Sequence, residues 1–160
     1  MGRFETYLSD HLSGSIVAID LARRRASAQG DDEIGTGLRR FAAEVERDQR
    51  TLRNVMAALD ISPSMTKELM ASGTAWIDSI RTAIKLPGAP NLVRDLELLI
   101  IGVRGKELLW KALDQKGVKT DPPIGDLQDR VAAQLADLDV LHALAVDQEF
   151  GSSEQPSRDA

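Results

Sequence analysis

The chain has 160 residues, a formal net charge of −5 and no cysteine. This length predicts one domain with a proper core, and the lack of cysteine excludes disulfide scaffolds, thiolate metal sites and cysteine nucleophiles. An acidic chain with 4% aromatic residues also lacks the basic face and the stacking side chains of a nucleic-acid-binding protein. We therefore expect no nucleic-acid partner.

Two long segments at the start of the chain have the three- and four-residue apolar spacing of amphipathic helices. They cover about residues 4–28 and 32–60. Gly30 separates them, because glycine readily ends a helix, and Asp32 is placed to cap the second. Pro63 cannot continue that second helix. The short break between the two predicts an antiparallel pair.

Two more long helices are predicted in the second half of the chain, over about residues 92–115 and 126–150. Asn91 is placed to cap the first of them, and Gly117 ends it. Their connection is again short, so these helices should also form an antiparallel pair. The helix over 92–115 is the most apolar, with apolar side chains around nearly all of its circumference.

The link between the two pairs, residues 61–90, is much longer and contains a shorter predicted helix over about 65–85. A helix of ~25 residues is ~37 Å long, so this link can return along the whole bundle. No segment alternates with the period of a strand, and the predicted fold class is all-α. We expect one helical-bundle domain over residues 1–150 and a disordered tail over 151–160.

Membrane and secretion signals are not evident. Met1–Glu5 lacks the basic and apolar regions of a secretory signal. The longest dense apolar stretch, Leu96–Val103, is far shorter than the ~20 residues that span a bilayer. We therefore expect a cytoplasmic protein without a membrane partner. No nucleophile motif or glycine-rich phosphate loop is present, so a non-enzymatic role is favoured.

This layout resembles the ferritin-like four-helix bundle superfamily, over roughly residues 4–150. Local stretches similar to small bacterial proteins of that shape are Tyr7–Leu12, Glu44–Asp48 and Leu96–Leu98, with Gly105, Lys106 and Trp110. The resemblance implies an up-down bundle of four long helices, with the short helix in the crossover. Di-iron members take carboxylates from two helices and a Glu-x-x-His pair from each of the others, and this chain has no Glu-x-x-His.

The middle of the expected bundle, where a metal would lie, carries charged and polar residues. Counting from the two hairpin turns at about 1.5 Å per residue places five residues there: Asp20, Glu44, Asp48, Lys106 and Gln134. An ammonium group that faces carboxylates neutralises them as a metal cation would. We therefore predict no metal site and no cofactor, and an ion-pair network of Lys106 with Asp48, Glu44 or Asp20 in its place.

The function that this pattern favours is self-association or contact with another protein, and a homodimer is the favoured assembly because it would cover the apolar flank of the helix over 92–115. Gly102 and Gly105 on that helix indicate close helix approach, within the bundle or at a dimer contact. Two alternatives stay open. One is an iron- or manganese-binding carboxylate protein with an atypical ligand set, in oxidative stress or metal handling. The other is a binder of a small apolar ligand.

Overall fold

The computed structural model describes residues 2–63 and 91–151. This part of the chain contains four long helices and no strand, so the all-α prediction is confirmed. The helices are α1 (Arg3–Gln29), α2 (Glu33–Ala58), α5 (Leu92–Gln115) and α6 (Ile124–Phe150). The predicted crossover helix over about 65–85, and the predicted tail beyond Gly151, lie outside the described residues.

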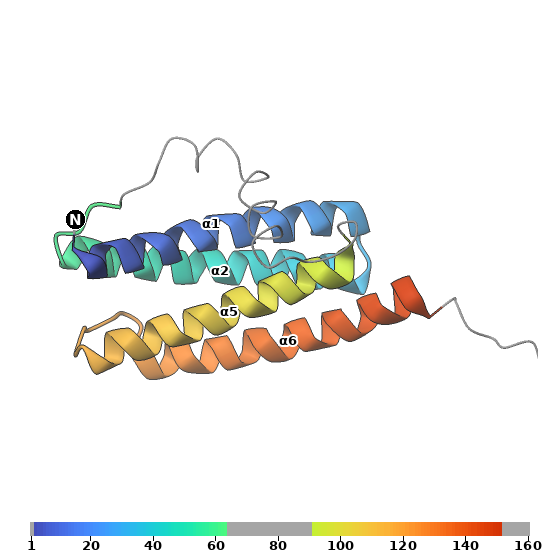
Figure 1. Ribbon diagram of the computed structural model, residues 1–160. Coiled ribbons are helices and arrows are strands. Elements are labelled where there is room, and N and C mark those ends of the chain that lie inside the picture. The colour runs from blue at the N-terminus through green and yellow to red at the C-terminus, as the bar shows by residue number, and fades with distance from the viewer. Residues whose placement is uncertain (1, 64–90, 152–160) are drawn as a thin grey trace, which may run out of the picture.

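Two antiparallel hairpins, α1–α2 and α5–α6, lie side by side and form the bundle (Figure 1). Across the contact between the hairpins, α1 faces α5 and α2 faces α6. The helices α2 and α5 run in the same direction, because α2 ends at the opposite end of the bundle from the start of α5 (Figure 1). A long connection between parallel helices is therefore part of this arrangement.

The predicted helix boundaries have clear local causes. The side chain of Asp32 accepts a hydrogen bond of 2.7 Å from the backbone N–H three residues later, which caps α2. Asn91 caps α5 in the same way at 2.9 Å. Gly30 and Gly117 follow α1 and α5 with φ values of 75° and 68°, which glycine adopts without strain. All four positions were predicted from the sequence to bound these helices, and the prediction is confirmed.

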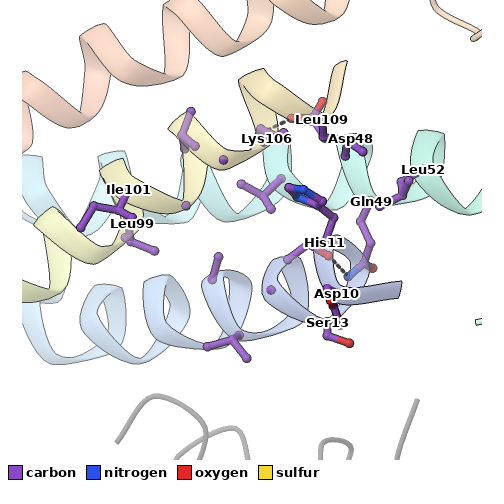
Figure 2. A pocket seen from close by; sticks show the side chains of 18 of the residues that line it. Asp10, His11, Ser13, Asp48, Gln49, Leu52, Leu99, Ile101, Lys106 and Leu109 are labelled. Atoms are coloured by element: carbon purple, nitrogen blue, oxygen red, sulfur yellow. Dashed lines mark hydrogen bonds and ion pairs between the residues drawn. The ribbon is translucent and has the colours of Figure 1, made fainter. Parts of the chain in front are cut away.

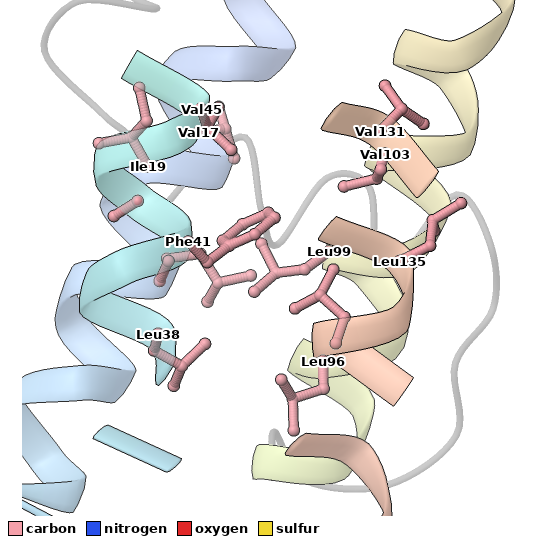
Figure 3. Packing of buried hydrophobic residues seen from close by; sticks show 14 of the residues in the cluster. Val17, Ile19, Leu38, Phe41, Val45, Leu96, Leu99, Val103, Val131 and Leu135 are labelled. Carbon is pink, nitrogen blue, oxygen red and sulfur yellow. The ribbon is translucent and has the colours of Figure 1, made fainter. Parts of the chain in front are cut away.

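The hydrophobic core lies where all four helices meet. Figure 3 shows Phe41 of α2 pointing toward Leu99 of α5, and Val17 of α1 and Leu135 of α6 belong to the same buried cluster. By contrast, α5 is not buried around its whole circumference, since Ile101 and Leu108 are 59% and 61% exposed. None of the described helices combines the length and apolar character needed to cross a bilayer.

Close helix approach occurs at a different glycine from those expected. A Cβ at Gly37 of α2 would lie 2.7 Å from Cδ2 of Leu141 on α6, so any larger residue there would require the Leu141 side chain to move. A Cβ at Gly102 would meet no atom within 4 Å, and one at Gly105 would meet only Cε1 of His11, at 3.9 Å. The prediction of close approach at Gly102 and Gly105 within the bundle is therefore wrong.

An ion pair joins the end of α1 to the start of α5. Nε of Arg25 donates to Oδ2 of Asp95 at 2.5 Å, and the Asp95 side chain is only 2% exposed. Arg25, the last of the three arginines Arg23–Arg25 near the end of α1, therefore neutralises a buried carboxylate. At the same end of the bundle, the backbone N–H of Leu92 donates to Oε1 of Glu149 on α6 at 2.8 Å.

Candidate functional site

A buried polar network joins three helices around Asp48, whose side chain is 3% exposed. Nζ of Lys106 donates to its Oδ2 at 2.5 Å, and a guanidinium nitrogen of Arg130 donates to Oδ1 at 2.6 Å. The side-chain amide of Gln134 donates to Oδ2 at 3.0 Å. Lys106 also donates to Oε1 of Gln134. Both oxygens of this carboxylate are therefore hydrogen-bonded, as burial of a charge requires.

The helices position these groups through their periodicity. Asp48 lies on the buried face of α2, between Val45 and Leu52. Arg130 and Gln134 are four residues apart on α6, so both side chains point toward the same neighbours. Sequence reasoning selected Gln134 but missed Arg130. The four-residue spacing is the signal that identifies it, because an arginine on the same face can reach the same carboxylate.

Burial dominates the electrostatics of Lys106, whose side chain is 13% exposed. Desolvation lowers the pKa of Lys106, while the charge and hydrogen bond of Asp48 oppose that shift. The nearby Arg130 charge lowers the pKa further and the Glu44 charge raises it. The cation is therefore held mainly by Asp48.

The structure brings together three of the five residues that the sequence placed at mid-bundle, namely Asp48, Lys106 and Gln134. Glu44 is half-buried on α2 and acts on Lys106 through its charge. Asp20 does not join the network, and its prediction is wrong. Its side chain is 45% exposed and pairs with Arg24, one turn along α1, at 2.9 Å.

The error at Asp20 has a simple geometric cause. Counting residues from a turn gives the height of a residue along the bundle, but each step also rotates the side chain by about 100°. The count placed Asp20 at mid-bundle, but its side chain points away from the core. Its neighbours Ile19 and Leu21 are buried instead.

A cleft of about 710 Å³ lies between α1, α2 and α5, beside the network. Asp48 and Lys106 form part of its wall. This volume falls within the range of about 300–1,000 Å³ that is typical of small-molecule sites.

The lining of the cleft separates into a polar end and an apolar end. One end carries most of the polar side chains, namely Tyr7, His11, Asp48, Gln49, Lys106 and Trp110, together with Leu52 and Leu109. The apolar end is formed by Val17, Leu21, Phe41, Val45, Leu98 and Leu99. Figure 2 shows this division, with His11, Asp48 and Lys106 at one end and Leu99 at the other. A molecule that fills the cleft would therefore meet hydrogen-bonding groups at one end and hydrocarbon at the other.

Three glycines, Gly14 of α1 and Gly102 and Gly105 of α5, contribute to the space in the cleft. A Cβ at Gly14 or Gly102 would meet no atom within 4 Å. Glycine within a helix costs about 0.5–1 kcal/mol relative to alanine. The three glycines do not bring helices together, and what they provide is open volume between α1 and α5.

Polar side chains at the rim of the cleft are held in place by contacts between α1 and α2. The amide of Gln49 donates to Oγ of Ser15 at 2.9 Å. The His11 ring packs edge-on against Tyr7, with 4.6 Å between the ring centroids. Burial lowers the pKa of His11, and the nearby Asp10 charge opposes the shift. His11 therefore favours its neutral form, in which one ring nitrogen donates and the other accepts.

The described residues do not fit a metal centre. No three histidine or carboxylate side chains come together in the part of the chain that the structure describes. The nearest sequence equivalent of a Glu-x-x-His pair is Asp139 with His142. Nε2 of His142 lies 3.3 Å from Oε1 of Glu97 on α5. Asp48 is already neutralised by Lys106 and Arg130, whose charges repel a metal cation. Elemental analysis is the direct test, and about two metal ions per purified chain would overturn this interpretation.

Comparisons with known proteins gave no match. No family model matches the chain, and neither the curated proteins nor the solved structures include a match. The ferritin-like resemblance therefore rests on the layout of the helices, and the function has to be argued from the geometry of the site.

Proposed function

We propose that this protein is a non-enzymatic, ferritin-like helical bundle that binds a small apolar molecule in the cleft between α1, α2 and α5. The ferritin-like assignment is supported by two antiparallel hairpins whose inner members, α2 and α5, run parallel (Figure 1). The binding role is supported by the cleft itself.

The observation that carries the proposal is the combination of volume, lining and glycines. A cleft of about 710 Å³ with an apolar end is large enough for a small organic ligand. Apolar surface exposed to water is unfavourable by about 25 cal/mol per Å², so a bound apolar molecule would stabilise the protein. Glycine at Gly102 keeps this space open where an alanine would make a more stable helix.

The test is saturable binding of a neutral apolar fluorophore, N-phenylnaphthylamine, to the purified chain. We expect binding at one site per chain, and we expect Gly102→Leu to weaken it by at least about tenfold because the leucine fills the cleft. Gly125→Leu is the matched control, since Gly125 on α6 also has open space around it and does not line the cleft.

Thermal unfolding of each variant verifies that the bundle remains folded, as we expect because a Cβ at Gly102 meets no atom within 4 Å. Equal binding to the wild type and to Gly102→Leu would show that the probe binds elsewhere. The absence of saturable binding to the wild type would exclude the proposed function.

A second candidate function, self-association, is favoured by the exposed face of α5. Ile101 and Leu108 are seven residues apart on one face, and both are more than half exposed. Two α5 helices packed antiparallel around a two-fold axis near Arg104 would place Ile101 against Leu108 of the second copy. Glu97 and Lys111 are each seven residues along the sequence from Arg104. Glu97 of one copy would therefore face the oppositely charged Lys111 of the other copy.

Sedimentation velocity over a range of concentrations tests this second candidate. We expect a dimer for the wild type and a monomer for Leu108→Glu, because an unpaired carboxylate would be buried at the contact. Val140→Glu on α6 is the control, since Val140 is similarly exposed at 54% and lies outside the α5 face. A wild type that remains monomeric at high concentration would rule out self-association.

A further inference from the structure

The polar end of the cleft has one hydrogen-bond donor that the described part of the protein does not use, and a second such donor is buried beside it. A lysine ammonium group has three N–H donors. Lys106 uses two of these N–H groups, which donate to Oδ2 of Asp48 and to Oε1 of Gln134. Within residues 2–63 and 91–151, no acceptor receives the third N–H of Lys106.

A second unused donor lies one turn along the same helix. Trp110 is 1% exposed, and its indole N–H is buried without a hydrogen-bond partner among the described residues. A buried donor without a partner costs about 1–3 kcal/mol. Lys106 and Trp110 are four residues apart on α5 and both line the cleft, so their side chains are neighbours on one helix face.

The charges of the hydrogen-bonded network also favour an anion. Lys106 and Arg130 carry two positive charges, and Asp48 carries one negative charge. One ligand carboxylate would balance these three hydrogen-bonded groups, although the nearby Glu44 charge already offsets part of the excess positive charge. Glu44 acts on Lys106 from α2 but does not line the cleft, and Asp10 lines it while exposed to solvent. Neither carboxylate forms a hydrogen bond to Lys106 in the part of the chain that the structure describes.

We propose that the cleft binds a monocarboxylic acid with an unbranched apolar chain, whose carboxylate accepts a hydrogen bond from Lys106 and, once the buried indole turns toward the cleft, a second one from Trp110. The chain would extend past Gly102 toward the apolar end at Leu98 and Leu99. From Trp110 to Leu98 the helix rises by about 18 Å, which suits a medium-length hydrocarbon chain. This inference rests on the proposed function, and it adds the chemical class and the orientation of the ligand.

Calorimetric titration with three probes that share one hydrocarbon chain tests the head group. The probes are decanoate, decanol and decylamine. We expect decanoate to bind about tenfold tighter than decanol, the difference that one charged hydrogen bond typically provides, and decylamine to bind weakest because its cation meets Lys106.

Three variants connect this preference to the named donors. Trp110→Phe keeps the aromatic ring but removes the N–H, so the preference for decanoate over decanol should fall severalfold. Lys106→Met should abolish the preference. Lys111→Met is the control, since Lys111 is 55% exposed on the same helix and pairs with Glu107. This control should bind all three probes as the wild type does.

Nuclear magnetic resonance gives an independent readout of the indole donor. The chain has two tryptophans, so Trp110→Phe identifies the Trp110 indole N–H signal directly. We expect that signal to move downfield with decanoate and to move much less with decanol.

The outcomes separate the two levels of the proposal. Equal binding of decanoate and decanol, with both lost in Gly102→Leu, would overturn the carboxylate inference and leave the apolar cleft in place. Failure of all three probes and of N-phenylnaphthylamine would overturn the proposed function itself. If Lys106→Met does not fold, the Trp110→Phe variant becomes the deciding test. An unchanged preference for decanoate over decanol in that variant would overturn the inference.

Discussion

Two ion pairs link the same two helices, α2 and α6, in very different surroundings. Arg40 and Asp137 are 3.0 Å apart with side chains 61% and 46% exposed. About two turns further along α2, Asp48 and Arg130 are 2.6 Å apart with side chains 3% and 24% exposed. Both pairs join an arginine to an aspartate, so burial, together with the further donors Lys106 and Gln134 on Asp48, separates an interaction that water screens from one on which the bundle depends.

The largest expected effect is the removal of the buried carboxylate. Asp48→Ala leaves Lys106 and Arg130 without their shared partner, and we expect the free energy of unfolding to fall by about 3–5 kcal/mol. Urea denaturation followed by circular dichroism measures this change. A loss below about 1 kcal/mol would mean that water reaches the network and that it behaves like a surface pair.

A double-mutant cycle with Asp48→Ala and Lys106→Met isolates the interaction between these two residues. Because they share a hydrogen bond of 2.5 Å in a buried site, we expect a coupling energy of about 1–3 kcal/mol. Additive effects of the two single substitutions would show that Lys106 is held by Gln134 or by solvent instead.

The exposed pair should contribute little. We expect Asp137→Ala to change the free energy of unfolding by about 0–1 kcal/mol, and any effect should shrink when salt is added, because screening weakens exposed charges. Unfolding curves at low and high ionic strength provide the measurement. A loss comparable with that of Asp48→Ala would contradict the difference drawn from burial.

The smallest effect concerns a titratable group at the cleft. Burial lowers the pKa of His11 below its ordinary value of 6.5, so the unfolded chain binds a proton more readily than the folded one. The stability contributed by neutral His11 is present above pH 6.5 and is lost as the pH falls toward the lower folded pKa. We expect His11→Gln to reduce this loss, as measured by unfolding curves between pH 7 and pH 5.

Titration of the two histidine rings by nuclear magnetic resonance complements the unfolding curves, and His142→Gln assigns the His11 signals. A His11 pKa at or above 6.5 would show that the ring is solvated, and the pH dependence would then have another origin.

Much of the fold was predictable from the sequence, whereas the site was predictable only in part. Apolar spacing and the caps at Asp32 and Asn91 located the helices, because these features act within one or two turns. Counting along the hairpins placed Asp48, Lys106 and Gln134 near the middle of the bundle, and the structure brings them into contact. The same count failed for Asp20, because height does not give rotation.

The sequence by itself determined the number of long helices among the described residues, their approximate ends, and the position of the buried charges at mid-bundle, but not the buried Asp95 at the end of the bundle. Only the tertiary structure decided which glycine brings helices together and which leave space, because tilt and rotation depend on the packing of side chains from other helices. Gly37 contacts Leu141 of α6, while Gly102 faces open volume, although both glycines are interior residues of long helices. The same packing brought Arg130 to Asp48 and left unused donors at the polar end of the cleft.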